Sequence, residues 1–189
     1  IHVVSAVGSG DVLVASGPPN VAHPDWSPDG RRIVFFSVTA VERKLLVTAR
    51  DRDGKWGAQQ RLTSDTVKEA YPKWSPDGKL VGYVREDDVA VIASEGGSPR
   101  VIADHGRLGG VALQVAWGGD GATVYASVRQ STGLLRFWAI PVAGGTPRLL
   151  LSEDAAHRLG NSQFSTDGKR LFFTLAAWEA DVWVMELKR

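Results

Sequence analysis

Two stretches of the sequence, HPDWSPDGRRIVFF at residues 23–36 and YPKWSPDGKLVGYV at residues 71–84, are near copies of each other. Each places a Trp before a Ser-Pro-Asp-Gly segment and ends in an apolar run. Such a sequence motif either builds a catalytic element or marks a structural unit that recurs along the chain. The remaining sequence decides between these two interpretations.

Two degenerate copies of the same motif follow, so the motif occurs four times in register. The aromatic residues that open the copies are separated by 48, 43 and 47 residues, which is close to the period of a propeller blade. Only the first two copies keep the Ser-Pro pair. The motif residues are Trp26, Pro28, Asp29 and Gly30; Trp74, Pro76, Asp77 and Gly78; Trp117, Asp120 and Gly121; and Phe164, Asp167 and Gly168.

The chemistry of the motif is that of a tight turn. Pro presets φ near about −65° at the second turn position, Asp hydrogen-bonds to nearby backbone, and Gly accepts a positive φ. The copies that lose Ser-Pro retain Asp-Gly, as a turn requires. We therefore expect the motif to join the first two strands of a hairpin, with the preceding aromatic ring packed between neighbouring sheets.

Short apolar, β-prone runs follow each turn and predict the strands of one antiparallel blade. The segment 151–158 has room for one helical turn, and helix is otherwise absent from the pattern. The sequence therefore predicts an all-β fold, a β-propeller of four-stranded blades. The predicted second strands are 32–36, 80–84, 123–126 and 170–174; the third strands are 45–48, 89–92, 135–140 and 181–185; fourth strands include 100–102 and 148–151.

The chain is expected to form a single propeller domain over residues 1–189. The pattern predicts about four blades, the last without a fourth strand, and a partial blade that contributes a third and a fourth strand at the N-terminus. The partial blade covers residues 1–20, and the blades cover 21–66, 67–107, 108–153 and 154–189.

Composition excludes several classes of function. The 189 residues carry a formal net charge of +1 and no Cys, so disulfides and thiolate zinc sites are impossible. Basic residues form no stripe, which argues against nucleic-acid binding, and no apolar run approaches the roughly 20 residues of a membrane span. The sequence has no nucleophile elbow, phosphate loop, His-Glu-x-x-His or dinucleotide fingerprint. We therefore predict no catalytic residue, no metal ligand and no cofactor.

Candidate binding residues lie at the start of each blade. In a propeller, the loops that enter the first strands surround the mouth of the central channel. Polar or amphipathic residues occur three positions before each motif aromatic, and others lie nearby. We expect these residues to line the channel entrance and to contact a protein or peptide; the alternative is that they are solvated loop residues. They are His23, Tyr71, Gln114 and Asn161, together with Glu69, His157 and Arg158.

The Trp-Ser-Pro-Asp-Gly repeat resembles that of the TolB-type β-propeller, a WD40-like (PD40) repeat family, over residues 21–186. Residues 181–187 resemble the closing strand of that family. Members usually have six blades. Either the N-terminal strand completes the last blade and closes a small ring, or the chain is the C-terminal part of a six-bladed ring. The second explanation is favoured, because the N-terminus supplies one strand too many for simple closure.

The resemblance implies a non-enzymatic scaffold that docks a protein or peptide at the channel mouth, in the periplasm or another extracytoplasmic compartment. An alternative is an accessory or sensor propeller of a larger protein, such as a prolyl-oligopeptidase-like peptidase, a receptor kinase or a transcription regulator. A lactonase-like metal enzyme is disfavoured, because the sequence offers no evident set of inward acidic and His ligands. An open ring is also expected to self-associate through its blade edges.

Overall fold

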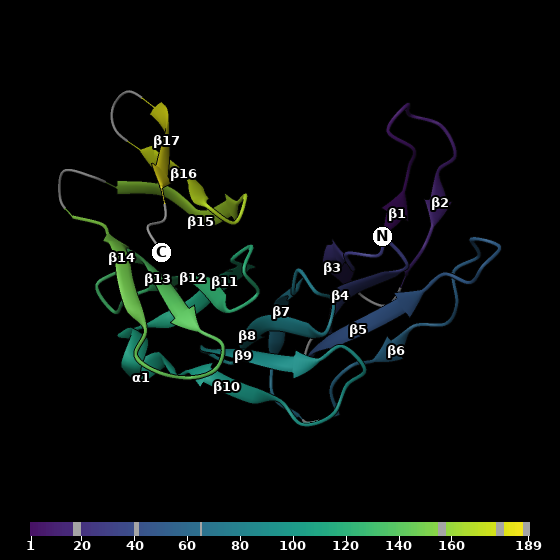
Figure 1. Ribbon diagram of the computed structural model, residues 1–189, viewed down its shortest axis with the longest axis horizontal. Coiled ribbons are helices and arrows are strands. Elements are labelled where there is room, and N and C mark those ends of the chain that lie inside the picture. The colour runs from purple at the N-terminus through teal and green to yellow at the C-terminus, as the bar shows by residue number, and fades with distance from the viewer. Residues whose placement is uncertain (17–19, 40–41, 65, 155–157, 177–179, 187–189) are drawn as a thin grey trace.

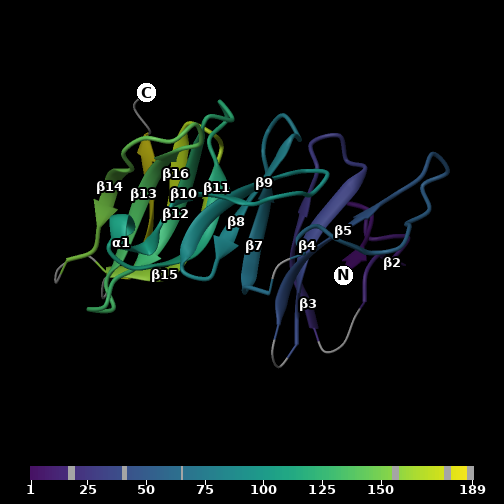
Figure 2. The ribbon, with the colours of Figure 1, turned by 90° about the horizontal axis from the view of Figure 1, so that it is seen from below.

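The computed structural model of the chain describes residues 1–16, 20–39, 42–64, 66–154, 158–176 and 180–186. The strands form consecutive antiparallel sheets, each built from one continuous stretch of sequence. Figure 1 shows these sheets fanned side by side in an open arc, and Figure 2 shows successive sheets as separate layers packed face to face. The prediction of an all-β propeller is therefore confirmed.

Four sheets correspond to blades, which we number in chain order, and a two-stranded N-terminal hairpin precedes them. The hairpin consists of β1 (His2–Val3) and β2 (Val12–Leu13). The first blade contains β3 (Asn20–Trp26), β4 (Arg32–Val38), β5 (Arg43–Ala49) and β6 (Gln60–Arg61). The second contains β7 (Glu69–Trp74), β8 (Leu80–Arg85), β9 (Asp88–Ala93) and β10 (Arg100–Ala103). The third contains β11 (Val111–Trp117), β12 (Thr123–Arg129), β13 (Leu135–Pro141) and β14 (Arg148–Ser152), and the fourth contains β15 (Arg158–Thr166), β16 (Arg170–Ala176) and β17 (Ala180–Glu186).

Helix among the described residues is limited to α1 (His105–Leu108), a single turn between the second and third blades. The Asp104 side chain caps α1 by accepting a hydrogen bond from the Arg107 N–H, and Gly109 ends the turn with φ of 70°. From the sequence, residues 151–158 had room for one helical turn. In the described part of this segment the expectation is wrong, because residues 151–152 belong to β14. No helix in the described part of the chain is long and apolar enough to cross a membrane.

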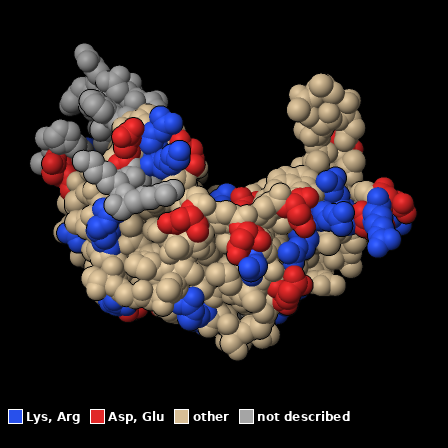
Figure 3. Space-filling view, viewed as in Figure 1, with Lys and Arg blue, Asp and Glu red and all other residues tan. Residues whose placement is uncertain are grey.

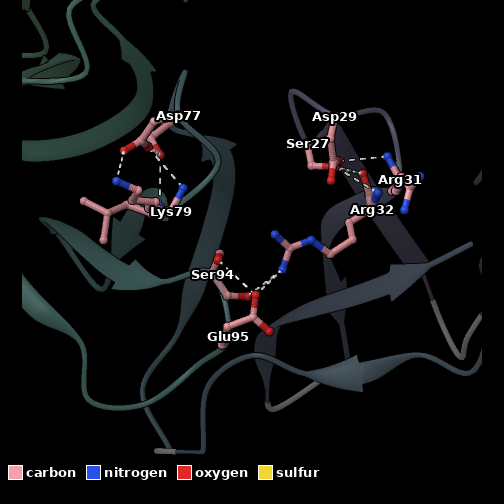
Figure 4. Close-up of polar contacts among 10 residues, drawn as sticks. Ser27, Asp29, Arg31, Arg32, Asp77, Lys79, Ser94 and Glu95 are labelled. Carbon is pink, nitrogen blue, oxygen red and sulfur yellow. Dashed lines mark hydrogen bonds and ion pairs between the residues drawn. The ribbon is translucent and has the colours of Figure 1, made fainter.

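The motif turns have the geometry that their residues predict. Gly30 and Gly78 take φ of 66° and 71°, and Gly121 and Gly168 are also left-handed. The Asp29 carboxylate accepts hydrogen bonds from Ser27 Oγ at 2.5 Å and from the Arg31 N–H at 3.0 Å, as Figure 4 shows. Asp77 accepts the equivalent bonds from Ser75 Oγ and the Lys79 N–H. The turn is therefore held by its own side chains in both intact copies.

These hydrogen bonds make the turns sensitive to pH. The Ser75 hydroxyl, followed by the Lys79 N–H, lowers the pKa of Asp77 below its ordinary value of 3.8. Because the pKa of the folded state lies below that of the unfolded chain, the carboxylate stabilises the fold above the unfolded-state pKa. This contribution disappears as pH falls through the folded-state pKa.

We therefore expect Asp77→Asn to lower the melting temperature at neutral pH and to have less effect at about pH 2, because protonation of the Asp77 carboxylate increases as the pH falls. Differential scanning calorimetry at both pH values measures the difference. Asp53→Asn, in an exposed loop, is the matched control. An equal loss at both pH values would show that the ionised carboxylate does not contribute.

The hydrophobic core lies between blades rather than within one compact centre. One cluster joins β8–β10 to β11 and β12, and others join the first blade to the second and the third to the fourth. Trp74, Trp117 and Phe164 are buried at these junctions, with 6%, 7% and 7% exposure. The expectation that every motif aromatic is packed between sheets is wrong for Trp26, which is 43% exposed. The N-terminal hairpin covers Ile33 and Phe35 instead of this indole.

Candidate functional site at the channel entrance

The first strand of each blade lies on the concave side of the arc, whereas β6, β10 and β14 lie on the convex side (Figure 1). Neighbouring first strands contact one another, from β3 to β7, β7 to β11 and β11 to β15. Residues of all four strands line a hollow of about 340 Å³, and the space-filling view in Figure 3 shows the molecule indented on this side. This hollow corresponds to the central channel of a propeller.

Every first strand is irregular in its N-terminal half. The pairing with the second strand shifts register there, which leaves one or more residues unpaired and redirects their side chains. All four first strands run in the same direction, so these irregularities gather at one end of the channel, the entrance. The shifts lie between Ala22 and Asp25, between Ala70 and Lys73, between Ala112 and Gln114, and between Leu159 and Phe164.

Two of the predicted site residues occupy these bulges with an unusual backbone. His23 has φ of 51° and Tyr71 has φ of 55°, and each precedes a Pro in the sequence. A positive φ is uncommon for residues with a side chain, and holding such residues costs about 1–3 kcal/mol each. Backbone strain of this kind clusters at functional sites, because the surrounding structure must over-determine it.

The structure brings His23 and Tyr71 together although they are far apart in the sequence. Their ring centroids are 4.6 Å apart in an edge-to-face contact, and the His23 ring stacks on Phe36 at 5.4 Å. Phe36 also meets Tyr71, at 5.6 Å. We call His23, Phe36 and Tyr71 the aromatic triad. Phe36 is buried, whereas His23 is exposed and Tyr71 is half-buried, so the triad presents two rings to solvent on an apolar base.

Partial burial, followed by the positive charge of Lys73, lowers the pKa of His23 below its ordinary value of 6.5. The imidazole is therefore neutral at neutral pH. A neutral His carries one donor and one acceptor nitrogen. The entrance thus offers hydrogen bonds from an uncharged ring beside the phenol of Tyr71.

Gln114 and Asn161 form a second pair of predicted residues. Both line a hollow of about 360 Å³ between the third and fourth blades. Gln114 Nε2 donates a hydrogen bond to the Phe164 carbonyl at 3.1 Å, which ties the two first strands together. Asn161 Oδ1 accepts a hydrogen bond from the Gln163 N–H at 2.8 Å. Each amide retains donor or acceptor capacity beyond the bond described.

The remaining predicted residues are placed differently. Glu69 is 1% exposed, and its carboxylate accepts hydrogen bonds from the Leu45 N–H and the Thr63 hydroxyl. It therefore holds the second blade against the first and is removed from the entrance surface, contrary to the expectation. Arg158 is exposed at the start of β15. His157 lies outside the described residues.

Sequence reasoning missed the ion pair in the channel wall. Lys73 Nζ lies 2.9 Å from Asp25 Oδ1, and Asp25 Oδ2 accepts the Trp74 N–H at 2.8 Å. The side chains of Lys73 and Asp25 are 36% and 23% exposed, and both line the channel hollow. The signal was available, since each residue directly precedes a motif Trp in an equivalent position.

The charges around this site are balanced rather than concentrated. The Asp25–Lys73 pair places one charge of each sign in the channel wall. The face in Figure 3 likewise carries acidic and basic side chains intermixed. Among the described residues, no group of three or more His, Asp or Glu side chains is arranged to hold a metal ion. The site as described supplies aromatic surface and neutral hydrogen-bonding groups.

Comparison with known proteins identifies the fold. No protein family and no curated protein matches the sequence. TolB from Acinetobacter baumannii matches with a TM-score of 0.71 and 15% identity, over 96% of this chain and 44% of that one. A puromycin-hydrolyzing peptidase from Mycobacterium tuberculosis matches with a TM-score of 0.67 and 18% identity, over 95% of this chain and 30% of that one.

A chain of the nidogen/laminin complex also matches, with a TM-score of 0.59 and 11% identity, over 88% of this chain and 76% of that one. At such identities these matches establish the fold. The resemblance to the TolB-type propeller is thus confirmed as structural likeness. The chain described spans less than half of the TolB chain and less than a third of the peptidase chain.

Proposed function

We propose that the protein is a non-enzymatic propeller scaffold that binds an extended peptide segment of a partner protein at the channel entrance. The observation that carries the proposal is the aromatic triad. His23 and Tyr71 come from different blades, adopt strained backbone conformations and meet over one buried ring. Packing alone does not require a His and a Tyr in left-handed conformations, whereas a binding surface benefits from fixed rings.

The chemistry of the entrance favours a peptide over a charged small molecule. Rings such as those of His23 and Tyr71 provide apolar faces with polar edges. The amides of Gln114 and Asn161 can donate to and accept from a peptide backbone. Among the described residues, the ion pair in the channel wall is Asp25 with Lys73, whose opposite charges offset each other. The site therefore gives no strong preference for an acidic or a basic ligand.

The proposal contains no catalytic step. The entrance side chains are an imidazole, a phenol and two amides, and no hydrogen bond among these described groups activates a nucleophile with a base. Fold likeness does not decide this point, since a single fold hosts many functions. The nidogen/laminin complex is a protein assembly that contains a similar fold, which is compatible with partner binding.

Peptide selection tests the proposal directly. A random displayed-peptide library is panned on the wild-type chain, and the dissociation constants of enriched peptides are measured by fluorescence polarisation. We expect His23→Ala/Tyr71→Ala to weaken binding at least about 10-fold, because interface aromatics commonly contribute more than about 1.4 kcal/mol each.

Arg31→Ala/Lys79→Ala, at the turns on the opposite end of the first strands, is the matched control and should bind normally. Circular dichroism and melting temperature establish that each variant remains folded. Failure to enrich any peptide, or equal binding by folded wild-type and double-variant chains, would contradict the proposal.

A second candidate is an accessory propeller of a larger enzyme. The specific observation is the match to the puromycin-hydrolyzing peptidase, which covers 95% of this chain but 30% of that one. Mass spectrometry of the endogenous polypeptide separates the candidates. A mass far above the 20.3 kDa of this sequence, with peptides from an attached hydrolase domain, would favour the accessory role.

A further inference from the structure

The motif Trp residues make the same hydrogen bond at successive blade junctions. Trp74 Nε1 donates to the Asp25 carbonyl at 3.2 Å, and Trp117 Nε1 donates to the Lys73 carbonyl at 2.9 Å. In both cases the acceptor is the residue directly before the motif aromatic of the preceding blade. The second and third blades therefore each present an indole that hydrogen-bonds to the first strand of the blade before it.

The motif glycines repeat the same relationship at the turns. A Cβ built on Gly78 would lie 3.5 Å from Pro28 Cδ, and one built on Gly121 would lie 3.9 Å from Pro76 Cδ. Each glycine thus faces the turn proline of the preceding blade. Together with the indole bonds, these contacts define one junction geometry that is used twice in succession.

The first blade has the same residues but lacks their partners. Trp26 is 43% exposed, and no described residue accepts a hydrogen bond from its Nε1. Its ring contacts two side chains of its own blade, Trp56 at 5.6 Å and the Arg50 guanidinium at 5.7 Å. A Cβ on Gly30 would meet Arg50 and no proline. We call the surface formed by Trp26 and Gly30 the Trp26 face.

The N-terminal hairpin fills only the outer part of the space beside the first blade. Ile1, Val3 and Val14 pack on Ile33 and Phe35. Figure 1 shows β1 nearer to the axis than β2, and in the described residues β1 pairs with β2 alone. The edge of β1 that faces the axis is therefore open. The space between this edge and the axis corresponds to the first and second strands of a blade.

We propose that the Trp26 face binds a two-stranded hairpin of the repeat's own type. The carbonyl before the aromatic of this hairpin accepts a hydrogen bond from Trp26 Nε1, its turn packs on Gly30, and its second strand pairs with β1. The occupant follows from continuity with the two junctions already formed in the chain. A second copy of this chain fits less well. Its fourth blade would present three described strands, whereas β1 already occupies the position of the third strand beside the first blade.

The chain supplies a suitable probe. Residues 68–87 contain the β7–β8 hairpin and the two-residue turn that leads into β9. A copy of residues 68–87 fused directly before Ile1 places Ile1 where β9 begins in the second blade. We expect hydrogen exchange of the Trp26 indole N–H, followed by NMR, to slow at least about 10-fold in the fused chain, as burial with a hydrogen bond requires.

Two matched controls accompany this experiment. Fusion of the same 20 residues in scrambled order should leave Trp26 exchange unchanged. The true fusion should also raise the melting temperature of the wild-type chain, and most of this gain should be lost when the same fusion is made on a Trp26→Ala chain. An unchanged exchange rate in the true fusion would overturn the proposal. So would sedimentation of the unfused chain as a dimer with Trp26 already protected, since a second copy would then be the occupant.

Discussion

Replacing Trp117 by Ala is expected to lower the free energy of unfolding by about 3–5 kcal/mol, the range for truncating a buried aromatic residue. The indole is 7% exposed, belongs to the cluster between the second and third blades, and donates to the Lys73 carbonyl. The truncation removes this hydrogen bond and opens a cavity beside Gly82, where an added Cβ would lie 3.1 Å from the indole nitrogen. Urea denaturation followed by circular dichroism measures the loss.

Trp26→Ala is the natural comparison, because it changes the same residue in the same motif. Trp26 is 43% exposed, and among the described residues its indole N–H has no hydrogen-bond acceptor, so we expect a loss of less than about 1 kcal/mol. The two variants therefore show whether the stability loss depends on the motif Trp itself or on its burial between two blades. Equal losses would mean that the motif Trp acts within its own blade and that the junction contacts contribute little.

The sequence predicted the blades well because their main determinants are local. Asp29 and Gly30 form a turn through their own side-chain and backbone preferences, wherever they occur in the chain. The apolar runs that follow pair with their nearest neighbours, as in the register of β4 with β5. The repeat period, the turn residues and the apolar strand pattern thus all indicate the same blade architecture. The prediction therefore needed no information on contacts between blades.

The errors arose where a property depends on another blade. The burial of Trp74 and the exposure of Trp26 differ because only one of them has a complete blade before it. Glu69 was expected at the entrance from its polarity, yet the buried Leu45 N–H and Thr63 hydroxyl hold its carboxylate in the interior. Sequence polarity cannot distinguish a solvated carboxylate from a satisfied buried one.

The entrance was predicted in part. Counting back from the motif identified His23 and Tyr71, but the bulges that give them positive φ arise from register shifts between strands. Phe36 was predicted only as the end of a second strand, although it forms the base on which both rings rest. The pattern therefore locates the site along the chain, and pairing between strands determines which side chains meet.

Buried carboxylates that bind backbone form a further blade-to-blade connection, and Glu153 provides its clearest test. Glu153 is 7% exposed, accepts the Leu135 N–H at 2.5 Å and also accepts the Leu159 N–H. Leu135 begins β13 and Leu159 lies in β15, so one carboxylate joins the third and fourth blades. Glu69 has a similar role at the start of β7, where it binds the Leu45 N–H of the first blade.

Glu153→Ala leaves both of these N–H groups without their acceptor, and each buried unsatisfied group costs about 1–3 kcal/mol. We expect a total loss of about 2–4 kcal/mol in urea denaturation. Glu95→Ala is the matched control, because the Glu95 side chain is 83% exposed. It forms an ion pair with Arg32 at 2.6 Å across the first junction and accepts a hydrogen bond from the hydroxyl of the adjacent Ser94 at 3.3 Å. An exposed ion pair contributes about 0–1 kcal/mol, so this variant should be near neutral. If both variants lose the same stability, charge rather than buried hydrogen bonding connects the blades, and the role assigned to Glu153 is wrong.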